Sequence, residues 1–189
     1  MAIKTARDIK KGSISKISIK PLEVNLYQTY IEVGVQAYRQ HYLHLWEDQN
    51  PDPYINISFT LDVLRNEALN SNTKLFLIYK DALAIGILKI NLDHALGNHR
   101  SKEVLLLDKI YILKAYSGQG VGKKVLDFVE KMARTTNKKI ITLDTMKHGP
   151  ALDFYKKNGF EIFNEIRLQF ATVKDDQRGM YVMLKNLRP

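Results

Sequence analysis

The chain has 189 residues, of which 45% are hydrophobic and 26% are charged, values that are ordinary for a globular domain with a full core. It contains no cysteine, which excludes disulfides, thiolate metal sites and a cysteine nucleophile, and fits a reducing compartment. No apolar run is long enough to cross a bilayer, and residues 1–20 lack the apolar core of a signal peptide. We therefore expect one cytoplasmic domain over residues 1–189, with no membrane partner.

The formal net charge of +9 is concentrated at the beginning of the chain. Residues 1–20 contain six lysines or arginines and a single aspartate, which is more than half of the excess. Such a segment could be a nucleic-acid arm, but a solvated terminus is the commoner outcome. We expect residues 1–13 to be a flexible basic leader and nucleic acid not to be a partner. The remaining positive charge could help to attract a polyanionic ligand.

The first elements are a strand and a long helix. Isoleucines at residues 14–19 predict a first or edge strand that ends before Pro21. From Leu22 onwards, apolar residues return at helical intervals and predict a helix that runs to about Leu43 or beyond. The residues that follow, 47–54, are expected to form a polar loop.

Three aromatic side chains lie at four-residue spacing near the end of this helix: Tyr38, Tyr42 and Trp46. Such a stripe is usually part of a core, but this one leads directly into the polar loop. Both core packing and a wall of a substrate cleft therefore stay open as interpretations. His41 and His44 lie three residues apart without an evident third ligand, so we expect no metal site.

The middle of the chain predicts a short helix and a hairpin. Thr60 can cap a helix that reaches Leu69, and the run Asn70-Ser71-Asn72 can end it. Residues 74–80 and 83–92 read as two strands joined by a tight turn, and residues 93–102 form a polar loop.

Residues 104–137 combine a buried strand, a glycine-rich turn and an amphipathic helix. The strand is apolar apart from the pair Asp108-Lys109, and glycines punctuate residues 117–122. Glycines allow close backbone approach to a ligand, and the first amides of a helix lack an intrahelical acceptor and favour an anion. This loop is a candidate phosphate cradle, although a tight turn alone would look similar.

Spacing excludes two common phosphate motifs. A dinucleotide fingerprint would need a third glycine where Lys123 stands, and a P-loop would need glycine at Ser117 and Ser or Thr following a Gly-Lys pair.

A second informative segment follows the predicted strand at residues 140–146. In His148–Phe160 (HGPALDFYKKNGF), Pro150 suits the first turn of a short helix. The pair Asn158-Gly159 suits a left-handed stop, after which Phe160 packs back. Two last strands are expected at residues 161–171 and 180–187, across a polar turn at 174–179. This order of elements predicts a mixed sheet with helices on both faces.

Together, the two segments resemble the GNAT superfamily of acetyltransferases. Its acyl-CoA loop has the pattern Gln/Arg-x-x-Gly-x-Gly/Ala, which Gly120 and Gly122 match and Ser117 does not. The second segment resembles the family pattern Asn-x-x-Ala-x-x-Phe-Tyr-x-x-x-Gly-Phe, with His148 in place of the asparagine. The residues in register are Ala151, Phe154, Tyr155, Gly159 and Phe160. The resemblance covers residues 75–187, and its style is closest to bacterial polyamine-type acetyltransferases.

The resemblance implies a mixed α/β (α+β) fold, with a mostly antiparallel sheet of about seven strands flanked by helices. It also implies acetyl-CoA as the acyl donor, without a metal. The residues that it places at the cofactor are Ile110, Tyr111, Ile112, Leu113, Gly118, Gln119, Gly120, Val121, Gly122, Lys123, His148, Ala151, Tyr155 and Lys157.

Two residues are candidates for proton transfer. The resemblance makes Tyr155 the general acid, since a phenol stays protonated at neutral pH and can donate to a departing thiolate. A core tyrosine bonded to backbone is the alternative. Asp108 interrupts the most apolar strand, which indicates either a base facing a wet cavity or a salt bridge with lysine or arginine. His148 is a second candidate base, and a backbone amide near Ile112 is the expected oxyanion donor.

The expected function is transfer of an acetyl group to a primary amine, on a small molecule such as a polyamine or on a protein, by direct attack in a ternary complex. A non-catalytic acyl-CoA-binding regulatory module and a transferase for another acyl group remain alternatives. Tyr38, Tyr42 and Trp46 are candidate acceptor contacts, and a homodimer is possible.

Overall fold

The computed structural model describes residues 16–187, so the expected leader at residues 1–13 lies outside the described residues. Within them the chain forms a single seven-stranded sheet with the order β1-β2-β3-β4-β5-β7-β6. The strands are β1 (Ile17–Pro21), β2 (Thr73–Lys80), β3 (Leu83–Asn91), β4 (Val104–Ile112), β5 (Ile140–Met146), β6 (Glu161–Arg167) and β7 (Gly179–Asn186). Neighbouring strands are antiparallel except β4 and β5, which confirms the predicted mixed sheet.

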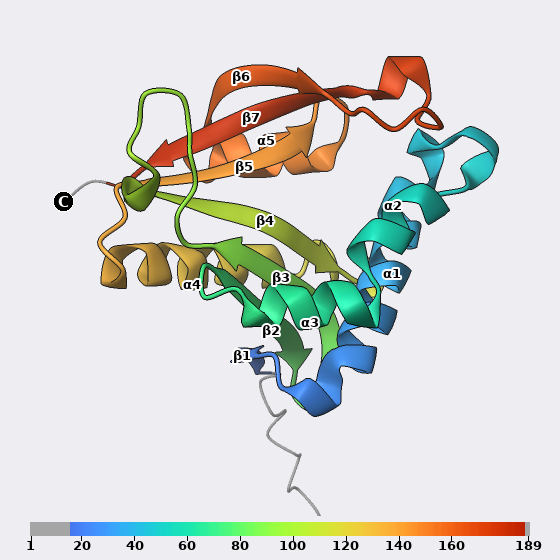
Figure 1. Cartoon of the computed structure of the whole chain (residues 1–189), viewed down its shortest axis with the longest axis horizontal. Helices are drawn as coiled ribbons and strands as arrows, with labels where there is room; N and C mark the ends of the chain where they lie inside the picture. Colours follow the sequence, from blue (N-terminus) through green and yellow to red (C-terminus); the bar gives the residue numbers. More distant parts are fainter. Residues whose placement is uncertain (1–15, 188–189) are drawn as a thin grey trace, which may run out of the picture.

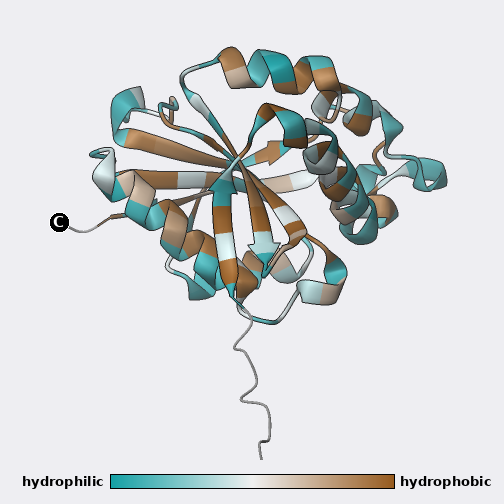
Figure 2. Ribbon diagram, turned by 90° about the horizontal axis from the view of Figure 1, so that it is seen from below, coloured by the Kyte–Doolittle hydropathy of each residue, from teal (hydrophilic) through white to brown (hydrophobic). Residues whose placement is uncertain are grey.

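Helices cover both faces of this sheet (Figure 1). One face carries α1 (Tyr27–Tyr42), α2 (Asp52–Ser58) and α3 (Leu61–Leu69), and the other carries α4 (Val121–Thr135) and α5 (Pro150–Lys157). Figure 2 shows brown and teal alternating along the helices and mostly brown strands, as amphipathic helices on an apolar sheet require. No helix among residues 16–187 is long and apolar enough to span a membrane.

The N-terminal elements differ from the predicted bounds. The first helix was expected from Leu22, but the Leu22 amide donates to the Leu75 carbonyl of β2 (2.9 Å), and α1 begins only at Tyr27. The polar loop predicted at residues 47–54 is partly wrong, because α2 begins at Asp52. Asn50 Oδ1 accepts from the Asp52 amide, and Pro53 needs no hydrogen-bond partner in a first turn.

The last predicted strand pair is confirmed, but its first strand is shorter than expected. β6 ends at Arg167 rather than near residue 171. Beyond it, Phe170 turns towards the helices and packs edge-on against Trp46, with ring centroids 5.4 Å apart.

The single parallel contact in the sheet is short. β4 and β5 pair only at Val104–Ile140, Leu105–Ile141 and Leu106–Thr142, after which the two strands diverge (Figure 1). A β-bulge starts at the same point, because Lys109 pairs with Lys89 and Leu107 with Ile90, which leaves Asp108 without a partner on β3. The middle of the sheet therefore opens as a wedge between β4 and β5.

A strap joins the two sides of the wedge at its open end. Trp46 forms an isolated antiparallel bridge with Val173. The Glu47 amide donates to the Thr172 carbonyl and the Lys174 amide to the Leu45 carbonyl, both at 2.9 Å. The connection from α1 to α2 is thereby tied to the connection from β6 to β7.

The N-terminal helical layer depends on apolar contacts with the sheet. Thr60 Oγ1 accepts from the Val63 amide (3.2 Å) and caps α3, as predicted, and Leu64 of α3 is 0% exposed in the core. Leu69, at the end of the same helix, is 85% exposed.

These positions give a matched test of the layer. Leu64→Ala should lower the free energy of unfolding by about 2–5 kcal/mol, because it leaves a cavity in the core. Leu69→Ala should change it by less than about 0.5 kcal/mol. Urea denaturation measures both, and equal losses would contradict the packing described here.

Candidate active site

Beyond the last β4–β5 pair, backbone groups of β4 have no partner on β5. The Leu113 amide donates to Ile85 of the neighbouring strand β3 (2.8 Å), so strand alternation turns the amides of Ile110 and Ile112 towards the open side. The Ile112 carbonyl also faces this way and accepts from His41 Nε2 of α1 (2.9 Å). An extended ligand lying in the wedge would meet donors and acceptors along β4.

The glycine loop follows β4 after a short 3-10 helix (Lys114–Tyr116) and ends at the first turn of α4. Gly118 and Gly120 have left-handed φ values of 72° and 78°, and Gly120 is the N-cap of α4. A Cβ at either position would meet no atom within 4 Å, so the space above the loop is open. The first amides of α4 have no intrahelical acceptor, and such amides favour an anion.

Side chains on either side of the loop hold it in place. Gln119 Nε2 donates to the Ala115 carbonyl (2.7 Å), and Lys80 Nζ of β2 donates to Gln119 Oε1 (3.0 Å). Val121 is buried, and Lys123 is exposed and ion-paired with Asp127 one helical turn on. A Cβ on Gly122 would lie 3.1 Å from Phe154 Cζ, so this glycine allows α4 and α5 to approach.

Tyr155 lies on α5, behind the wedge. It is 7% exposed and packs edge-on against Phe154 and Phe160, with ring centroids 5.3 and 5.6 Å apart. Burial raises the pKa of the phenol, and the Tyr42 phenol of α1 raises it further, although the two helices cover opposite faces of the sheet. No hydrogen bond within residues 16–187 involves the Tyr155 hydroxyl, so the alternative of a core tyrosine bonded to backbone is not observed. The Tyr155 phenol therefore stays protonated at neutral pH and has no hydrogen-bond partner among residues 16–187.

The remaining residues expected at the cofactor lie around α5. Ala151 is half-buried against the core that α4 and α5 share, and His148 and Lys157 are exposed at the two ends of the helix.

Asp108 is held by lysines. Its carboxylate lies 2.8 Å from Lys89 Nζ and 3.4 Å from Lys109 Nζ, and it accepts from Asn91 Nδ2 (3.3 Å). Lys89 also binds Glu67 of α3 at 2.6 Å. Burial raises the pKa of Asp108, but Lys109 and Lys89 outweigh it and hold that pKa below its usual value. Of the two interpretations left open, the salt bridge is therefore present.

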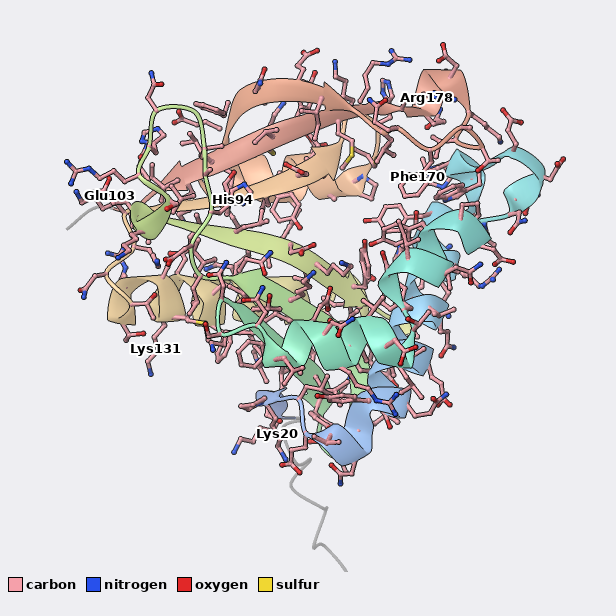
Figure 3. All side chains as sticks on the ribbon, viewed as in Figure 1. Lys20, His94, Glu103, Lys131, Phe170 and Arg178 are labelled. Atoms are coloured by element: carbon pink, nitrogen blue, oxygen red, sulfur yellow. The ribbon has the colours of Figure 1, made fainter. Side chains whose placement is uncertain are left out.

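A cluster of aromatic side chains covers the opposite side of the wedge; we call it the tyrosine cluster. It comprises Tyr38, Tyr42, Tyr54 and Tyr111. Tyr38 stacks on Tyr54 with centroids 4.4 Å apart, and the Tyr54 and Tyr111 hydroxyls are hydrogen-bonded at 2.8 Å. Figure 3 shows Phe170 next to α2, at the edge of this cluster.

Trp46 supports this cluster from behind. It is 1% exposed, and its indole donates to the Tyr38 hydroxyl (3.1 Å). Tyr111 was expected at the cofactor through its strand, yet its side chain packs in the tyrosine cluster. Tyr30, also 1% exposed, is the one residue between 16 and 187 whose side chain has a polar atom that is completely buried and has no partner.

Sequence reasoning missed two polar residues at the wedge. Asp144 interrupts the apolar strand β5 as Asp108 interrupts β4, and this signal could have identified it. His94, on the loop at residues 93–102, lies beside β4 and β5 in Figure 3 and interacts electrostatically with Asp144. Among the residues described, no three His, Cys, Asp or Glu side chains could together hold a metal ion.

Comparisons with known proteins agree with this geometry. Residues 71–162 match the family described as the acetyltransferase (GNAT) domain. An uncharacterised N-acetyltransferase of Lactobacillus delbrueckii subsp. lactis is 23% identical over 145 residues, which are 75% of this chain and 82% of that protein. The spermidine N(1)-acetyltransferase of Thermoplasma acidophilum is 25% identical over 153 residues, which are 77% of this chain and 89% of that protein.

Solved structures share the fold. The PaiA N-acetyltransferase of Thermoplasma acidophilum, solved in complex with coenzyme A, superposes with a TM-score of 0.73 at 19% identity, over 91% of this chain and 99% of that chain. This chain combines these matches with three structural features: the sheet order, the wedge between β4 and β5, and the glycine loop before α4. Residues 71–162 are therefore a GNAT acetyltransferase domain, and the chain as a whole is similar to N-acetyltransferases over about three quarters of its length.

Proposed function

We propose that the protein transfers an acetyl group from acetyl-CoA to the primary amine of an acceptor, in a ternary complex. The observation that carries this proposal is the wedge between β4 and β5, which opens beside the glycine loop and in front of the unpartnered Tyr155 hydroxyl. The coenzyme A bound in the structure of the PaiA enzyme supports the assignment of acetyl-CoA as the acyl donor. The chain's lack of cysteine supports a cytoplasmic location.

The residues around the wedge fit coenzyme A. Amides of residues 118–123 would bind the pyrophosphate, and the backbone of β4 at Ile110 and Ile112 would bind the amide groups of the pantetheine arm. Ala151 leaves room for that arm, and His148 and Lys157 would lie along its course.

Acyl transfer needs an oxyanion donor and an acid. The amine nitrogen attacks the thioester carbonyl, the negative charge develops on its oxygen, and a backbone amide near Ile112 would stabilise it. The C–S bond then breaks, and Tyr155 donates its proton to the leaving sulfur. Burial keeps this phenol protonated until then. Asp108 remains ionised beside its lysines and contributes a fixed negative charge next to the attacking amine.

The acceptor would bind against the tyrosine cluster, with Tyr38 and Tyr42 as its wall and Trp46 as support. The spermidine specificity named for one relative favours a polyamine, although the wedge would also admit the amine of a peptide. A purely regulatory acyl-CoA-binding module would not require the unpartnered hydroxyl of Tyr155.

The glycine loop can be tested with a matched pair of variants. Gly120→Val places a side chain in the open space above the loop and strains a left-handed backbone, so affinity for coenzyme A should fall about 10- to 100-fold. Gly159→Val introduces the same kind of strain, at φ +84°, outside the loop, and should leave this affinity unchanged. Isothermal titration calorimetry measures both, and equal affinities for the two variants would refute the assignment.

Tyr155→Phe keeps the ring in its packing and removes only the proton. Turnover should fall by about 10²–10⁴-fold when chemistry limits the rate, while affinity for acetyl-CoA hardly changes. The loss should shrink for thioesters of more acidic thiols, whose thiolates leave without help. Tyr27→Phe, at a buried tyrosine of α1, is the control. Normal turnover of the Tyr155 variant, with product release shown not to limit the rate, would remove this residue from the mechanism.

A further inference from the structure

We propose that Asp144 is the carboxylate that receives the ammonium group of the acceptor and takes its proton. This inference rests on the proposed acetyl transfer and assigns the base that such a transfer requires.

The placement of Asp144 follows from the strand register. The last parallel pair is Leu106–Thr142, and Asp108 and Asp144 each lie two residues beyond it, on the two strands that flank the wedge. They therefore stand on either side of its narrow end. The β-bulge at Asp108 occurs at the same level.

The packing of its neighbours also determines on which face of the sheet the Asp144 side chain lies. Ile141 and Leu143 pack in the core shared with α4 and α5, whereas Met146 packs against the apolar core under α1–α3 that includes Tyr38, and Ile140 packs with Leu96 of the 93–102 loop. Since side chains alternate along a strand, Asp144 points to the face that carries α1 and this loop. It lies between the two apolar groups and is exposed there.

The two carboxylates differ in their partners. Asp108 is committed to Lys89 and Lys109, whereas within residues 16–187 Asp144 has no hydrogen bond or ion pair. The groups that face Asp144 are His94 from the loop and Asp108 from β4, while its neighbour on β7 is the apolar Val182. A cationic amine that enters the wedge would find in Asp144 a carboxylate that is free to bind it.

Opposite environments separate the two carboxyl groups chemically. Although Asp144 is exposed, the surrounding protein partly desolvates its carboxyl group and raises the pKa; His94 lowers it and Asp108 raises it, and the net shift is upward. The pKa of Asp108 is shifted downward. A pair of carboxyl groups shifted apart in this way commonly has distinct roles, one as a fixed charge and one as a proton carrier.

The proton balance of the step is then complete. The ammonium gives one proton to the Asp144 carboxylate, which passes it to water on the exposed face. The neutral amine forms the C–N bond and loses its second proton by the same route. The sulfur leaves with the proton of Tyr155, which is restored from solvent. The products are the amide, the free thiol and one proton released to water.

The experiment compares Asp144→Asn with wild type, using acetyl-CoA and spermidine as the probe amine, with N-terminally free peptides as second probes. At pH 7, where the amine is cationic, kcat/KM should fall about 10²–10⁴-fold. The loss should shrink as the pH approaches the pKa of the amine, because free amine needs no base. Asp144→Glu should recover part of the activity. Asp62→Asn, at an exposed aspartate of α3, should behave as wild type.

The outcomes separate this inference from the proposed function. Calorimetry with coenzyme A should give the same affinity for wild type and Asp144→Asn, which shows that the variant is folded. If wild type is active and Asp144→Asn loses nothing, or loses equally at every pH, the inference fails and the proposed function stands. If wild type binds coenzyme A but acetylates none of the amines, the proposed function fails and takes the inference with it.

Discussion

The three-residue parallel contact between β4 and β5 is the constraint on which the rest of the structure depends. Backbone amides and carbonyls inside a sheet are normally paired, and leaving them unpaired away from water is costly. Here the pairing stops at Leu106–Thr142, and the two strands expose facing edges that a ligand with amide groups of its own can satisfy. The glycine loop follows β4 after one short 3-10 helix, so the N-terminus of α4 comes soon after the strand that diverges from β5. Cofactor binding and acyl transfer, as proposed above, therefore both depend on the divergence of β4 from β5.

Charge placement at the narrow end of the wedge follows from the bulge in β4. Asp108, the extra residue, faces Lys89, which Glu67 also binds, and this network fixes one carboxylate as a permanent negative charge. Asp144 on the facing strand has no such lysine. Two residues of the same type, at the same level of two neighbouring strands, are therefore chemically different because only one of them has lysines beside it.

Much of this could be predicted from the sequence, because the relevant signals are local. The glycines at 118, 120 and 122, the helix after them and the Tyr155 segment each depend on residues close together in the chain, and the structure forms these elements where expected. The helix α2 was missed because Asn50-Pro51-Asp52-Pro53 reads as a loop, although prolines also suit a first helical turn. The partners of Asp108 and the neighbours of Asp144 could not be predicted, because they depend on strand register and on a bulge. The burial of Trp46 depends on Val173 and Phe170, which lie more than a hundred residues away in the chain.

The strap between Trp46 and Val173 has a mechanical consequence for the wedge. Pairing at Leu106–Thr142 fixes the distance between the strands at the closed end, and the strap fixes the distance between the two halves of the molecule at the open end. Because backbone hydrogen bonds hold both ends of the gap, its width is set before any ligand binds. Little binding free energy is then needed to order the protein around a ligand. Selection among acceptors depends instead on the size and shape of the molecule that fits the gap.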